Sequence, residues 1–148
     1  MTTLGKKGAT LLEALIAFII LSLVFSASLT IIVNSKKQTQ ITQERINAVN
    51  VASMVRDEIE SEYTYVDIAA LIATTDIEVI NSNCNASGIT GICDVFSENI
   101  GDIVYDDLIT VVFLQANTTS QTYQIVHFTV EVVYWEELSV KIEGVIYE

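Results

Sequence analysis

The 148-residue sequence contains no proline, two cysteines and a single histidine. Without proline, no residue lacks the backbone donor that a helix needs, so a long helix can continue without a proline kink. Two thiols and one distant imidazole, from Cys84, Cys93 and His127, do not make the ligand set of a zinc site. A glycine-rich loop ending in Gly-Lys-Ser or Gly-Lys-Thr is also absent, so the sequence has no P-loop nucleotide motif.

Basic residues are scarce as well: seven Lys and Arg stand against nineteen Asp and Glu, for a net charge of -12. This balance argues against direct nucleic-acid binding through a basic face. No motif pairs His127 with a nucleophile or carboxylate, which favours an ordinary sheet-surface histidine over a catalytic one. We therefore expect no enzymatic activity, no cofactor and no small-molecule substrate.

An apolar run from Ala9 to Val33 carries one charged side chain, Glu13, and has no glycine or proline. As a helix rising ~1.5 Å per residue it would extend ~37 Å, enough to cross the ~30 Å hydrocarbon core of a bilayer. An ionised carboxylate in that core costs ~2.5–3.5 kcal/mol on insertion scales. Glu13 therefore either extends to the headgroups or has a partner.

The segment from Lys6 to Glu13, with sequence KKGATLLE, resembles the class III signal of type IV prepilins and pseudopilins. The resemblance implies that a prepilin peptidase cuts between Gly8 and Ala9 and methylates the new amine of Ala9. It also implies that Glu13, the fifth residue of the mature chain, pairs in the assembled filament with the Ala9 amine of a neighbouring subunit. Ala9 departs from the family pattern, which most often has Phe at this position.

The predicted domain organisation follows from this resemblance and from the polarity of the chain. Residues 1–8 form the leader peptide, and residues 9–35 form the membrane or filament-core half of one long helix. Residues 36–148 form a globular pilin domain, with the outer half of the helix at 36–62 and an antiparallel sheet at about 104–148. Apolar residues at helical spacing predict the stripe that this outer half packs on the domain: Ile41, Ala48, Ala52, Val55 and Ile59.

The expected fold class is α+β, with the long helix packed on a sheet of three to four antiparallel strands. Period-two patterns predict a strand from Gln124 to Tyr134 and another beginning at Leu138. Only a turn of three or more residues, around residues 135–137, keeps the apolar faces together and sets Glu131 opposite Lys141. Shorter elements are also expected: a helix within 66–73, a strand at 77–80, a strand at 109–114 and a polar turn at 117–121.

Two further groups of residues are candidate sites. Cys84 and Cys93 lie in a loop rich in Asn, Ser and Gly, and in a domain outside the cytoplasm a disulfide is their simplest use. Asp102, Asp106 and Asp107 could hold calcium, as in some pseudopilins, but their spacing fits no loop signature and solvated turn residues are favoured.

The expected function is that of a structural subunit of a type IV pilus or a similar filament, more specifically a minor pilin related to the I-type pseudopilins. A pseudopilin of a type II secretion or competence machine is the alternative. An uncleaved single-pass protein presenting an outer binding domain is the alternative of another class. The expected partners are other pilin subunits, prepilin peptidase and a membrane assembly platform. The subunit would span the membrane once with its C-terminal domain outside and then enter an extracellular filament.

Overall fold

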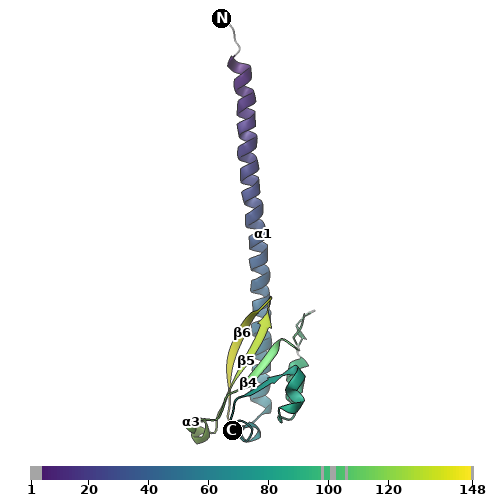
Figure 1. The fold of residues 1–148 in the computed structure, drawn as a ribbon, viewed down its shortest axis with the longest axis vertical. Helices are drawn as coiled ribbons and strands as arrows, with labels where there is room; N and C mark the ends of the chain where they lie inside the picture. The colour runs from purple at the N-terminus through teal and green to yellow at the C-terminus, as the bar shows by residue number, and fades with distance from the viewer. Residues whose placement is uncertain (1–4, 98, 101–102, 106, 148) are drawn as a thin grey trace. The chain divides into compact units, whose positions relative to one another are not determined.

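A computed structural model describes residues 5–97, 99–100, 103–105 and 107–147. The fold is α+β, as predicted, and the contacts divide the chain after Ile41 into two compact units. Helix α1, Gly5–Glu62, contains all the described residues of the first unit and the beginning of the second (Figure 1). The second unit, Thr42–Glu148, holds every strand and the remaining helices.

A four-stranded antiparallel sheet forms one layer of the second unit, and the outer part of α1 forms the other (Figure 1). The strand order is β1-β4-β5-β6, and β2 and β3 form a separate two-stranded ribbon. The strands are β1 (Ile77–Ile80), β2 (Asn99–Ile100), β3 (Ile103–Val104), β4 (Ile109–Phe113), β5 (Val126–Tyr134) and β6 (Leu138–Ile146). The short helices are α2 (Tyr65–Ala69), η1 (Asn81–Ala86), η2 (Ile92–Ser97) and α3 (Thr118–Tyr123).

The predicted register of the final hairpin is confirmed. Tyr134 pairs with Leu138, and Glu131 pairs with Lys141. The Lys141 ammonium lies 2.8 Å from a Glu131 carboxylate oxygen. The turn has three residues, although it contains no glycine, and both Trp135 (φ 25°) and Glu136 (φ 58°) adopt left-handed backbone conformations.

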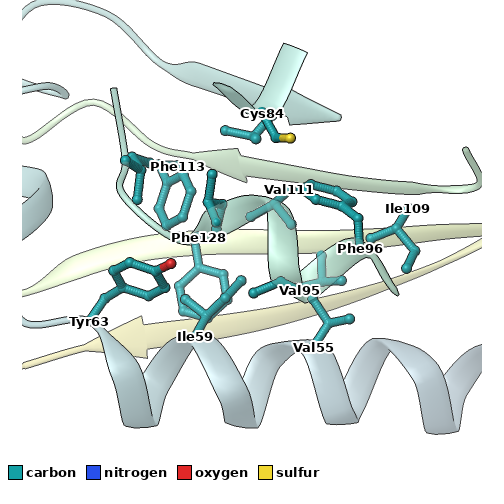
Figure 2. Close-up of a cluster of buried hydrophobic side chains, with 14 of the residues drawn as sticks. Val55, Ile59, Tyr63, Cys84, Val95, Phe96, Ile109, Val111, Phe113 and Phe128 are labelled. Carbon is teal, nitrogen blue, oxygen red and sulfur yellow. The ribbon is translucent and has the colours of Figure 1, made fainter. Parts of the chain in front are cut away.

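The hydrophobic core lies between the sheet and α1, and Figure 2 shows Val55 and Ile59 of the helix directed toward the strand residues. Phe113 of β4 and Phe128 of β5 lie with ring centroids 5.7 Å apart. The predicted helix stripe is buried from Ala48 onward, whereas Ile41 is only partly buried. Val51, which was not among the predicted residues, is also buried in this stripe. The core-facing residues of β5 before Tyr134 are also buried: Val126, Phe128, Val130 and Val132.

The open edge of β1 is covered by the side chain of Asn83. The Asn83 carboxamide oxygen accepts from the Ile80 N–H at 2.8 Å, and its nitrogen donates to the Glu78 carbonyl at 3.1 Å. These two backbone groups point away from β4, so the amide takes the place of a further strand.

Two local elements differ from the prediction. Residues 118–123 form α3 where a polar turn was expected at 117–121, because the Asn117 side chain accepts from the Ser120 N–H at 2.8 Å and caps a helical turn. The sheet also differs from the predicted span of about 104–148: its fourth strand, β1, comes from 77–80, while Val104 belongs to the separate ribbon.

Candidate assembly site

The apolar part of α1 is the one segment in the described chain that is long and apolar enough to cross a membrane. Its mean hydropathy reaches 2.7, and none of that window is buried. Every described side chain from Leu11 to Val33 is exposed. A helix that is apolar on all sides and covered by nothing requires an apolar surrounding, either lipid or other helices.

Three hydroxyl groups within this segment are satisfied by the helix itself. Ser22 donates to the Ile19 carbonyl at 2.9 Å, and Ser28 donates to the Val24 carbonyl at 2.8 Å. Thr30 donates to the carbonyl of Ser26 in the same way, at 3.2 Å. These side chains therefore enter an apolar medium with their donors already bonded.

Glu13 is different, because its carboxylate has no hydrogen-bond or ion-pair partner among the residues that the structure describes. Glu13 belongs to α1, as Gly8 and Ala9 do. These residues precede the longest uncharged stretch of the helix, which begins at Ala14. A carboxylate in an apolar surrounding either extends to the headgroups or pairs with a cation. Glu13 is therefore the candidate residue for a contact with another subunit.

A disulfide joins Cys84 of η1 to Cys93 of η2, with an S–S distance of 2.02 Å and Cα atoms 5.2 Å apart. The loop between them reaches the end of α1, where the Tyr63 hydroxyl donates to the Thr90 carbonyl at 3.1 Å. Burial, and then the nearby carboxylates led by Glu62, raise the pKa of Tyr63 to about 12, so this donor stays protonated at neutral pH.

The other candidate residues do not converge on a chemical centre. His127 is exposed on the outer side of β5, and Asp107 is exposed. Asp102 and Asp106 lie outside the described residues. Within the described ranges, no group of three or more His, Cys, Asp or Glu side chains could hold a metal ion.

A surface feature that the sequence analysis missed lies on the second-unit part of α1. Ile46 and Val49 are 49% and 37% exposed on the side of the helix away from the buried stripe. With neighbouring polar residues they line a shallow groove of about 300 Å³, formed by Thr42, Arg45, Ile46, Val49 and Asn50. The available signal was two aliphatic residues at helical spacing outside the predicted stripe.

An exposed apolar N-terminal helix, a single carboxylate near its start and a packed α+β domain together define a type IV pilin-like protein. A family model described as "Competence system putative prepilin ComGE" matches residues 10–83, which is half of the chain. The chain belongs to this family of competence-system prepilins. Neither the curated proteins nor the solved structures contain a significant match to it.

Proposed function

We propose that this protein is a non-enzymatic structural subunit, and a minor one, of a competence filament of the type IV pilus class. The observation that carries the proposal is Glu13, a carboxylate without a partner among the described residues, on a segment of α1 that is otherwise apolar and exposed. A membrane anchor needs no such charge, whereas a subunit that exchanges lipid for neighbouring helices can use it as a contact.

The partner we propose for Glu13 is the α-amine of Ala9 in a neighbouring subunit. This amine exists only after prepilin peptidase has cut between Gly8 and Ala9. The pair replaces a lone charge by an ion pair inside an apolar helix bundle. Removing one partner of a buried pair typically costs ~3–5 kcal/mol, which is enough to decide whether a subunit stays in the filament.

The proposed location changes with assembly. Before assembly the apolar part of α1 spans the membrane, with the domain of residues 42–148 outside. The disulfide between Cys84 and Cys93 supports an oxidising compartment for this domain. After processing and methylation of Ala9, an assembly platform transfers the subunit from the membrane to the extracellular filament.

Intact-mass analysis of the membrane-extracted protein, from cells with and without prepilin peptidase, tests the proposal. The expected result is loss of residues 1–8 and addition of one methyl group only where the peptidase is present. A full-length chain in the presence of active peptidase would contradict the filament assignment and favour an uncleaved single-pass protein. The amount of this chain in sheared filaments, relative to the other subunits, tests its minor status.

A further inference from the structure

The groove on α1 defined by Thr42, Arg45, Ile46, Val49 and Asn50 contains the one Lys or Arg side chain without an ion pair among the described residues of the second unit. Among the described residues of that unit, Arg56 pairs with Asp57 at 2.6 Å and Lys141 pairs with Glu131 at 2.8 Å. Arg45 is exposed and makes no ion pair with any residue that the structure describes. In a chain with a net charge of -12, an unpaired arginine beside exposed aliphatic side chains is a place where an acidic element can bind.

The tip of the β5–β6 hairpin has the complementary chemistry. Glu136 and Glu137 are exposed, and neither forms an ion pair within the described parts of the chain. Leu138, the next residue, is 47% exposed, and Trp135 at the start of the tip is partly buried. The tip (Trp135, Glu136, Glu137, Leu138) therefore presents carboxylates next to an apolar surface, as the groove presents a guanidinium next to an apolar surface.

We propose that the hairpin tip of one copy of this chain docks into the α1 groove of a second copy. Glu136 and Glu137 then face Arg45, while Leu138 lies against Ile46 and Val49. Because the tip and the groove are different surfaces, the contact is heterologous and leaves a free groove on one copy and a free tip on the other. The contact rests on the proposed function, and it requires that copies of this minor subunit occupy neighbouring positions in one filament.

Cysteine cross-linking in the full-length chain tests the contact directly. A Val49→Cys variant and a Glu137→Cys variant, carrying different affinity tags, are produced together in cells that have the peptidase, and oxidised dimers are counted. The matched control replaces Glu137→Cys by Glu143→Cys, an exposed position on β6 away from the tip. We expect the tip variant to give at least about fivefold more mixed dimer than the control. Equal yields overturn the contact.

Charge reversal supplies the second arm of the test. In the Val49→Cys and Glu137→Cys pair, Arg45→Glu on the groove copy lowers the yield of cross-linked dimer about fivefold, and Glu136→Arg on the tip copy restores it. Lys37→Glu makes the same change in net charge outside the groove and leaves the yield unchanged. A loss in both Arg45→Glu and Lys37→Glu, with no restoration, assigns the effect to net charge and overturns the proposal.

The experiments distinguish failure of the proposed function from failure of the tip-to-groove contact. Intact mass and filament content are measured on the same samples as the cross-links. A chain that is cut and enters filaments without a tip-to-groove cross-link overturns the contact alone. A chain that is neither cut nor incorporated overturns the proposed function and, with it, the contact. Cross-linking of the tip to a different subunit overturns the assignment to a second copy.

Discussion

The carboxylate of Glu60 on α1 accepts a hydrogen bond from the backbone N–H of Val145 on β6 at 3.1 Å. The register of the hairpin directs this N–H away from β5, so the bond joins the helix to the open edge of the sheet. The contact spans 85 residues of sequence and holds the final strand against the first helix.

Removing this contact should lower the stability of the domain modestly. We expect Glu60→Ala to reduce the free energy of unfolding by about 0.5–1.5 kcal/mol, because the exposed N–H recovers part of its bonding from water. Thermal unfolding of the full chain in detergent measures the change. Glu60→Gln keeps an acceptor oxygen and should lose less; an equal loss in both variants would assign the effect to charge.

Gly144 on β6 is required by space. An added Cβ atom would clash with the Phe128 ring and lie 2.9 Å from the Cγ atom of Arg56. We expect Gly144→Ala to destabilise the domain by about 1–3 kcal/mol, the range for overpacking a core. Glu143→Ala, at the exposed neighbouring position, is the control for substitution in this strand. A normal unfolding midpoint for Gly144→Ala would contradict the close packing at this site.

The disulfide should contribute stability through the unfolded chain. Replacing Cys84 and Cys93 together by Ser should cost ~2–3 kcal/mol, as expected for a short closed loop. Unfolding of the wild type should become easier on addition of a reductant, while the double variant should not respond. Equal behaviour of the two proteins without reductant would mean that the bond adds no stability.

The Glu131–Lys141 ion pair should make the domain less stable in acid. The hydrogen bond from Lys141, followed by that from Ser139, lowers the pKa of Glu131 below its ordinary value of 4.5. A lowered pKa stabilises the fold fully above the unfolded-state value, and the contribution disappears as the pH falls through the folded-state value. Glu131→Gln should therefore weaken the fall in stability below pH ~4.5, measured as unfolding midpoints across pH. An unchanged pH profile would exclude this contribution.

Glu13 should affect assembly more than processing. Glu13→Ala and Glu13→Gln are expected to be cut as efficiently as the wild type but to enter filaments at least about tenfold less, because each removes one half of the proposed intersubunit ion pair. Immunoblots of membrane and sheared fractions measure both steps. Ser22→Ala, which changes another polar side chain of the same helix, is the control. Normal incorporation of both Glu13 variants would remove the ion-pair mechanism.

Much of the domain fold was predictable where local patterns agree. The sequence predicts that the long helix ends at about Glu62 and that a short strand lies at 77–80. The structure confirms both. The hairpin register was predictable because alternating apolar residues and the Glu131–Lys141 pair admit one alignment. A slip by one residue would have turned the apolar face toward solvent.

Other features depend on the complete fold. The pairing of β1 with β4 joins strands about thirty residues apart, and neither short strand specifies its partner. The turn accepts left-handed Trp135 and Glu136 because the flanking strands require that twist, although glycine is the residue normally expected there. For the candidate site, the linear motif identified Gly8, Ala9 and Glu13, whose processing and assembly roles stay predictions. The groove beside Arg45 had only a weak sequence signal, because the exposure of Ile46 and Val49 depends on which helix face the sheet covers.

The hydrogen bonds of the Asn83 amide affect how readily two copies of the domain can join through their sheets. If the subunits are held in the membrane before assembly, as proposed, confinement to two dimensions brings their domains together repeatedly. An unprotected strand edge would let neighbouring sheets join irreversibly, in the manner of an amyloid seed. By bonding the Glu78 carbonyl and the Ile80 N–H, Asn83 removes one acceptor and one donor from the template that this edge offers. A single asparagine thus makes this edge a poorer site for the addition of a strand from a second copy.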